Sequence, residues 1–141
     1  MCPAAPANVA VERVPFRTAI QFNIKGNEDT VGKTLLTVPA GKNLTLEYVG
    51  ASFFGEGNPT YFLRFVSNFV DLASWTVTTG LWQGAMAGHY RTLNQPTALN
   101  FAGGEEVFAQ AMRSHKGMFT TVRIMVNGYL TDVPCARASG Q

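Results

Sequence analysis

Residues 106–128, EVFAQAMRSHKGMFTTVRIMVNG, contain the pattern that decides the fold class. Apolar residues recur at every second position in both halves of this stretch: Val107, Ala109, Ala111, Val122, Ile124 and Val126. Because successive side chains of a strand point to opposite faces, this period predicts two strands that each bury one face. The Ser114–Gly117 segment between them has the composition of a turn, and it predicts that the two strands form a hairpin.

The same period of two extends through most of the chain. It predicts a half-buried strand over 20–24 and further strands near 44–49, 61–66 and 75–78, with the strand at 61–66 central in a sheet. Leu44, Leu46 and Tyr48 share one face, but after Gly50 the apolar positions change parity, which predicts a bulge or a bend between two sheets. Turn residues separate the runs and helical patterns are nearly absent. We therefore predict an all-β antiparallel sandwich, with a jelly roll as the specific expectation.

Composition and charge narrow the class of protein. The 141 residues suffice for one domain, and we expect a tail at 1–7, a sandwich domain at 8–134 and a tail at 135–141. Hydrophobic residues make up 46% and charged residues only 14% of the chain, which excludes a disordered protein. The basic residues are dispersed and the net charge is only +2, so we expect no nucleic-acid partner. No apolar run approaches the roughly 20 residues that a membrane-spanning helix needs.

Two short motifs resemble a group of small exported bacterial proteins of uncharacterised role. The first is Val38–Lys42, VPAGK, followed by the apolar alternation of 44–49; the second is Gly128–Pro134, GYLTDVP, in which Thr131 replaces the usual apolar residue. The resemblance implies an exported β-sandwich, secreted, periplasmic or on the cell surface. It brings no catalytic residues, and the departure at Thr131 predicts that this position faces solvent.

The cysteines Cys2 and Cys135 lie near opposite ends of the chain. A disulfide between them would close almost the whole chain and would stabilise it by about 4 to 5 kcal/mol in the loop-entropy model. Two free thiols, or a lipid on Cys2, are the alternatives. The Ala5–Ala7 segment resembles the end of a signal-peptide cleavage site, and a plain flexible tail is the other interpretation.

Catalytic and metal-binding patterns are missing from the sequence. His115 belongs to the predicted turn, and His89 has no nucleophile motif beside it. The cysteine and histidine spacings match no zinc site, and the acidic turn at 27–29 supplies too few oxygen ligands for calcium. We therefore expect a protein that is not an enzyme and that needs no metal or other cofactor.

Aromatic residues of the irregular middle give the strongest functional signal. Trp75, Trp82 and Tyr90, with Gln83 and Arg91 as polar neighbours, have the composition of a surface that stacks on sugars and hydrogen-bonds their hydroxyls. Tryptophans that fill the core, or that line a subunit interface, are the alternatives. One hypothesis is therefore a module that binds a glycan or another extracellular surface.

A second hypothesis is a structural protein that self-associates. It would form a homo-oligomeric jelly roll within an extracellular or virion-like assembly, and Phe53 and Phe54 would together form its apolar patch.

Overall fold

The computed structural model describes residues 12–56, 60–67, 70–77, 82–83, 88–114, 116–117 and 119–133, with the backbone alone at 56, 70–72, 82–83 and 88–90. These residues form nine strands: β1 (Val14–Ile24), β2 (Thr30–Thr37), β3 (Lys42–Glu56), β4 (Tyr61–Ser67), β5 (Val70–Val77), β6 (Trp82–Gln83), β7 (Gly88–Phe101), β8 (Glu106–Arg113) and β9 (Thr120–Asp132). None of the described segments is a helix of the length and apolarity required to cross a membrane.

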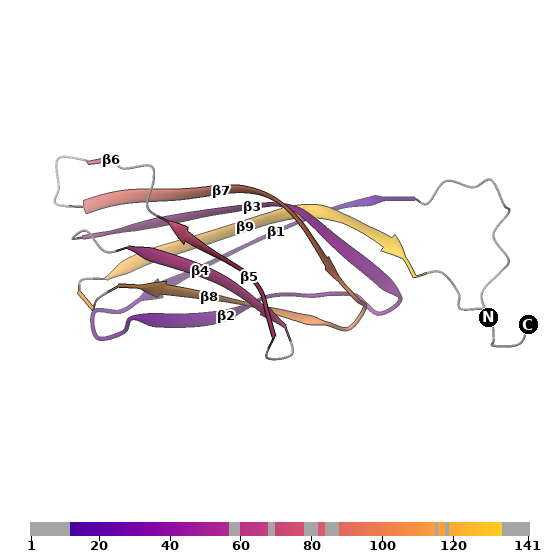
Figure 1. Ribbon diagram of the computed structural model, residues 1–141, viewed down its shortest axis with the longest axis horizontal. Helices are drawn as coiled ribbons and strands as arrows, with labels where there is room; N and C mark the ends of the chain where they lie inside the picture. The colour runs from indigo at the N-terminus through magenta and orange to yellow at the C-terminus, as the bar shows by residue number, and fades with distance from the viewer. Residues whose placement is uncertain are drawn as a thin grey trace, which may run out of the picture.

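The strands pack as two antiparallel sheets, one above the other (Figure 1). The five-stranded sheet has the order β1-β9-β3-β7-β6, and the four-stranded sheet has the order β2-β8-β4-β5. Each strand lies in the opposite sheet from the strand before it, with two exceptions: β5 follows β4 in the same sheet, and β7 follows the two-residue β6 in the same sheet. This order is that of a jelly roll, so the predicted fold is confirmed.

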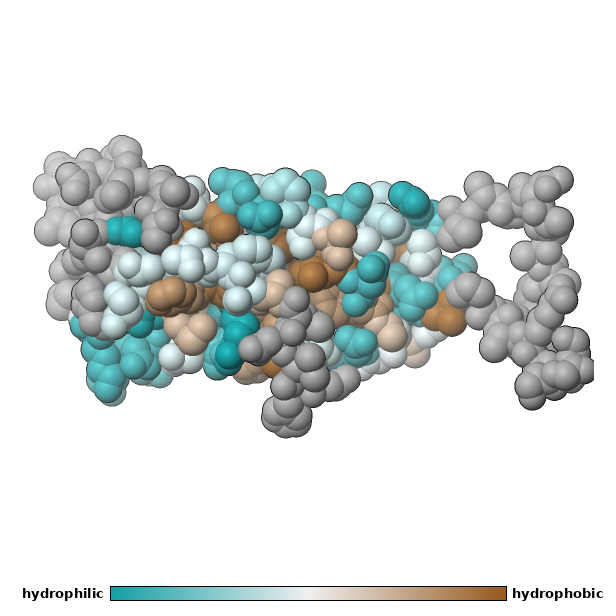
Figure 2. All heavy atoms as spheres, viewed as in Figure 1, coloured by the Kyte–Doolittle hydropathy of each residue, from teal (hydrophilic) through white to brown (hydrophobic). Residues whose placement is uncertain are grey.

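The core lies between the two sheets and is made by the predicted alternation. In β4, Tyr61, Leu63 and Phe65 are fully buried, and the strand is central in its sheet as predicted. Phe53 from the other sheet stacks on Tyr61 with ring centroids 4.5 Å apart, which joins the two layers. Figure 2 shows apolar side chains along the middle of the molecule, where the sheets face each other, and hydrophilic ones along the margin over β7.

The predicted hairpin of β8 and β9 is wrong. β8 pairs with β2 and β4, whereas β9 pairs with β1 and β3 in the other sheet. At the end of β8, Arg113 N–H donates to Asp29 O (2.9 Å) and Ser114 N–H donates to Thr60 O (2.9 Å), so its neighbours are loops of other strands. The alternation determines which face of a strand is buried, but it does not determine which strand becomes its partner.

A bulge interrupts β3, as the parity change predicts, but it lies at Glu47 and not at Gly50. The pairing of β3 with both β7 and β9 shifts between Leu46 and Tyr48, so Glu47 has no partner. Consequently Leu46 and Val49 are buried, and Tyr48 is not in the core face to which the sequence assigned it. β3 stays in one sheet throughout.

Gly128 of β9 lies opposite Leu46, at the edge of this bulge. A Cβ at Gly128 would lie 1.8 Å from the carbonyl oxygen of Thr45, so the two backbones approach too closely for any other residue. The glycine of the C-terminal motif is therefore required by the bulge in β3.

The VPAGK segment forms the turn that the sequence predicts. Lys42 N–H donates to Pro39 O (3.2 Å), and Gly41 has a φ of 78°, as the third residue of a type II turn requires. The β7–β8 loop lies against this turn, since Val38 N–H donates to Glu105 O (2.8 Å) and Gly104 N–H donates to Val38 O (2.9 Å). These hydrogen bonds join the two loops at one end of the sandwich, which is called the firm end below.

The opposite end of the sandwich contains a buried guanidinium. Arg113 is 5% exposed, and its Nε and Nη atoms donate to the carbonyl oxygens of Lys25 (2.7 Å) and Glu28 (2.7 and 3.0 Å) and to Thr120 Oγ1 (3.2 Å). The same threonine hydroxyl lies 3.2 Å from the hydroxyl of Tyr61, whose pKa is raised by burial. Carbonyl acceptors hold this cation in place, and it closes the β1–β2 loop over the core.

Candidate functional site

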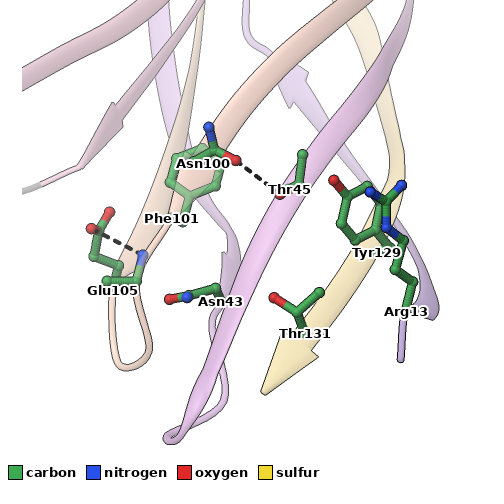
Figure 3. A pocket seen from close by; sticks show the side chains of 9 residues that line it. Arg13, Asn43, Thr45, Asn100, Phe101, Glu105, Tyr129 and Thr131 are labelled. Carbon is green, nitrogen blue, oxygen red and sulfur yellow. Dashed lines mark hydrogen bonds between the residues drawn. The ribbon is translucent and has the colours of Figure 1, made fainter. Parts of the chain in front are cut away.

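An open groove of about 600 Å³ lies at the firm end of the five-stranded sheet (Figure 3). It is formed where β3 begins and β7 and β9 end, together with the residue before β1 and the β7–β8 loop. The residues that line it are Arg13, Asn43, Thr45, Asn100, Phe101, Ala102, Glu105, Tyr129 and Thr131.

Strand register places these side chains together. Thr45 of β3 lies opposite Asn100 of β7 on one side and opposite Tyr129 of β9 on the other, and Asn43 lies opposite Thr131. Leu44 and Leu46 point into the core, so the alternating residues of β3 point outward. The groove therefore occupies the outer face of the five-stranded sheet, the face turned away from the four-stranded sheet.

Hydrogen bonds fix the polar side of the groove. Thr45 Oγ1 donates to Asn100 Oδ1 (2.8 Å), which leaves the amide NH₂ of Asn100 as a donor for a bound molecule. The carboxylate of Glu105 accepts from Ala102 N–H (3.3 Å) and from Ser67 Oγ (3.0 Å). These bonds orient both groups before any ligand arrives, which lowers the entropy cost of binding.

Arg13 and Tyr129 form the other side of the groove. The Arg13 guanidinium lies 4.5 Å from the centroid of the Tyr129 ring, in a cation–π contact. Figure 3 shows Arg13 against this ring on one side of the groove and Glu105 on the other. Amides, hydroxyls, the aromatic rings of Phe101 and Tyr129 and two separated charges are groups that bind a neutral or weakly charged polar molecule.

The lining offers few groups for catalysis. Of the described side chains around the groove, Glu105 is the one carboxylate, and neither histidine nor cysteine is among them. Within the part of the chain that the structure describes, no three His, Cys, Asp or Glu side chains lie close enough to hold a metal ion. The acidic turn at 27–29 is instead tied to Arg113 through the carbonyl oxygen of Glu28.

The structure brings two of the three sequence-predicted aromatic residues together and places the third, Trp75, in the other sheet. Trp82 lies opposite Tyr90, and Gln83 opposite His89, in the pairing of β6 with β7, but the side chains of these four residues lie outside the description. This pair is at the other end of the same sheet from the groove. Trp75 belongs to the four-stranded sheet, where it packs against the core.

Two of the expected surface residues point into the sandwich. Trp75 is partly buried, and its ring is nearly perpendicular to that of Phe65, with the ring centroids 5.2 Å apart. Arg91 lies opposite the buried Phe53 and is only 5% exposed, which does not agree with its expected place in a polar rim. Register explains Arg91, because a residue opposite an inward-facing residue also faces inward.

Several remaining sequence expectations concern residues that the structure does not describe. Cys2, Cys135 and His115 lie outside the described residues. Val14 lies opposite Leu130, so the first and last described strands are neighbours at the end from which the two tails continue.

No protein-family model and no curated protein matches this chain. Structures with a similar fold include dimeric latent PorU from Porphyromonas gingivalis, at 14% identity and a TM-score of 0.49 over 92% of this chain. This chain spans only 14% of that PorU chain. A chain of the cyanophage Pam1 capsid asymmetric unit has 15% identity and a TM-score of 0.44, covering 92% of this chain and 93% of the capsid chain. Eiger TNF from S. frugiperda has 8% identity and a TM-score of 0.40, covering 92% and 98%. Similarity at this level says nothing about function.

Sequence reasoning missed two tyrosines on the outer face of the five-stranded sheet: Tyr129, which lines the groove, and Tyr48. The ring of Tyr48 lies over Gly50, where an added Cβ would be 3.2 Å from its Cε1 atom, and its hydroxyl hydrogen-bonds to Asn94 Oδ1. Tyr48 therefore lies along the sheet surface. Tyr129 reaches this face through the alternation of β9, whose residues Val122, Ile124 and Val126 are buried, and Tyr48 reaches it through the bulge.

Proposed function

We propose that this jelly roll is a non-catalytic binding module of an exported protein and that it holds a glycan in the groove of the five-stranded sheet. The observation that carries the proposal is the row Asn100–Thr45–Tyr129, which places an oriented amide, a hydroxyl and an aromatic ring side by side. Sugars present C–H faces that pack on aromatic rings, and they surround these faces with hydroxyls that amides can bind.

The composition of the groove supports binding without turnover. Glycoside hydrolysis by the usual mechanism needs two carboxyl groups on either side of the scissile bond. The described lining supplies Glu105, whose two oxygens already accept hydrogen bonds from Ala102 and Ser67. The motifs VPAGK and GYLTDVP support an exported location through their resemblance to exported proteins.

The test is titration of the domain with soluble neutral and acidic polysaccharides, measured by calorimetry. Tyr129→Ala removes the stacking ring and is expected to weaken binding about tenfold or more, as loss of a binding hot spot does. Asn100→Ala removes one oriented amide and is expected to weaken binding several-fold. Phe119→Ala is the matched control, since Phe119 is a 53% exposed aromatic at the opposite end of the sandwich. Equal binding by Tyr129→Ala and Phe119→Ala would refute the groove as the site.

Self-association is the second candidate function, and one observation favours it. Phe54 is 46% exposed on the outer face of β3, although large aromatic residues are usually well buried. The expected joint patch with Phe53 does not exist, because Phe53 is fully buried on the other face of the strand. Light scattering should give a discrete oligomer that Phe54→Ser reduces to monomers; a monomeric wild-type protein would remove this candidate.

A further inference from the structure

The outer face of β1 and β9 carries a line of arginines that begins in the groove. Arg13 precedes β1, Arg17 follows four residues later, and Arg123 of β9 lies opposite Gln21, a further four residues along β1. At about 3.3 Å per residue, these steps are roughly 13 Å each, and the line is roughly 26 Å long. All three side chains are exposed. Because Arg123 comes from a distant part of the sequence, the dispersed basic residues of the chain gave no sign of this line.

Little negative charge opposes these arginines. None of the three forms a salt bridge with a described carboxylate. Glu12, the residue before Arg13, is exposed, and so is Glu47 at the bulge of the neighbouring strand β3. Asp132 is paired with Lys42, and Glu105 is held on the far side of the groove. The three arginines outnumber the exposed carboxylates near them, Glu12 and Glu47, so the line is a net positive edge of this face.

A lysine from the other sheet adds to the positive charge at this edge. Lys33 of β2 brings its Nζ atom 3.5 Å from the carbonyl oxygen of Gln21, beside Arg123. The edge thus carries four cations, and its charge is greatest at the end farthest from the groove.

Apolar rows separate the arginines. Between Arg13 and Arg17 lies the pair Pro15–Tyr129, and between Arg17 and Arg123 lies the pair Ala19–Met125, with Met125 37% exposed. The surface therefore alternates cationic and apolar rows along one line. A linear chain in which charged sugars alternate with neutral ones presents the complementary pattern, because its neutral sugars offer C–H faces between the negative groups.

We infer that this edge binds an acidic polysaccharide, with the groove holding one end of the bound segment. The inference rests on the proposed glycan-binding function and names its substrate class. A nucleic acid fits less well, since one strand of a duplex carries a charge about every 3.4 Å and so about eight over this length, against three arginines and Lys33. Apolar rows between the cations would also leave many phosphates unpaired.

The experiment measures binding of the whole chain to three polymers: hyaluronan, in which acidic and neutral sugars alternate, neutral dextran, and single-stranded oligothymidylate. We expect hyaluronan to bind best. Its affinity should fall steeply between about 0.01 M and about 1 M salt, because the screening length shortens from about 30 Å to about 3 Å. Each of Arg13→Gln, Arg17→Gln and Arg123→Gln should weaken binding roughly threefold, and the triple variant roughly thirtyfold.

Two further variants control for charge and folding. Lys116→Gln removes the same charge from an exposed residue in the β8–β9 connection, at the other end of the sandwich, and should leave binding unchanged. Changing all three arginines to lysine keeps the charge and should retain most of the affinity.

Each unfavourable outcome has its own meaning. Dextran binding equal to hyaluronan binding, with no effect of the triple variant, would overturn the acidic specificity and leave the groove as a neutral-glycan site. Stronger binding of the oligonucleotide would overturn it in favour of a nucleic acid. Absence of binding to all three polymers would refute both this inference and the proposed function.

Discussion

Replacing Gly128 with alanine tests the link between the bulge in β3 and the stability of the sandwich. The new Cβ would lie 1.8 Å from the carbonyl oxygen of Thr45 and 2.9 Å from the Cα of Leu46. Carbon and oxygen atoms approach to about 3.3 Å even in close C–H···O contacts, so β9 must move away from β3 by about 1.5 Å. Both clashing atoms belong to the backbone, so no side-chain rotation can relieve the clash.

The expected cost follows from the position of β9. It lies between β1 and β3, so displacing it stretches hydrogen bonds on at least one side. Overpacking of a fixed interior costs about 1 to 3 kcal/mol, and each lost ladder bond adds about 1 kcal/mol. We expect Gly128→Ala to lower the free energy of unfolding by about 3 to 5 kcal/mol, a large share of the 5 to 15 kcal/mol of an ordinary domain.

Urea denaturation followed by circular dichroism measures this loss, with two other glycines as references. Gly117→Ala meets no atom within 4 Å and should change stability by less than about 0.5 kcal/mol. Gly41→Ala also meets no atom within 4 Å, but its φ of +78° disfavours a Cβ, so it should cost about 1 to 2 kcal/mol. If Gly128→Ala unfolds at the same urea concentration as Gly117→Ala, the backbone contact does not exist and the register at the bulge is incorrect.

Three further predictions concern the buried end and the core. Arg113→Met leaves the carbonyl oxygens of the 25–28 loop without their donor and should lower stability by about 3 kcal/mol in the same urea assay. Burial raises the pKa of Tyr61, so its hydroxyl ionises first in the unfolded chain, and the free energy of unfolding falls as pH rises above about 10. In thermal melts at increasing pH, Tyr61→Phe should therefore lose less stability than the wild-type protein. Phe53→Ala should cost about 3 to 5 kcal/mol and Phe54→Ala less than about 1, because only Phe53 is buried; equal costs in thermal melts would contradict the assigned faces.

The fold class was predictable because alternation is a local property. Val122, Ile124 and Val126 are fully buried, as their spacing requires, and the same holds along β4 and β8. Strand partners were not predictable in this way. The SHKG segment has the composition of a hairpin turn, yet the chain crosses there from one sheet to the other. A short polar connection is compatible with both paths, and only the pairing of β8 with β2 and β4 distinguishes them.

The candidate site was less predictable than the fold because it depends on register. The sequence neighbours of Arg91 predict a place in a polar rim, but its partner Phe53 places it inside. Conversely, Arg17 and Arg123 are 106 positions apart in the printed sequence, and they share one edge because β1 lies along β9. The aromatic signal of the sequence led to Trp75, Trp82 and Tyr90, whereas the structure places the rings of Phe101 and Tyr129 in the groove and that of Tyr48 on the same outer face.

The bulge at Glu47 accounts for the outward direction of Tyr48 and lies beside the strand that carries Tyr129. Without it, Tyr48 would continue the parity of Leu44 and Leu46 and would point into the core, since a one-residue shift moves every following side chain to the other face. The same bulge brings the backbones of Thr45 and Gly128 together, and the residue after that glycine is Tyr129, which points outward. A single extra residue thus turns one ring to the surface and fixes the strand that carries the other. Bulges commonly re-aim side chains at functional sites, and here the bulge adjoins the groove, so the irregularity of β3 supports placing the binding site on this face.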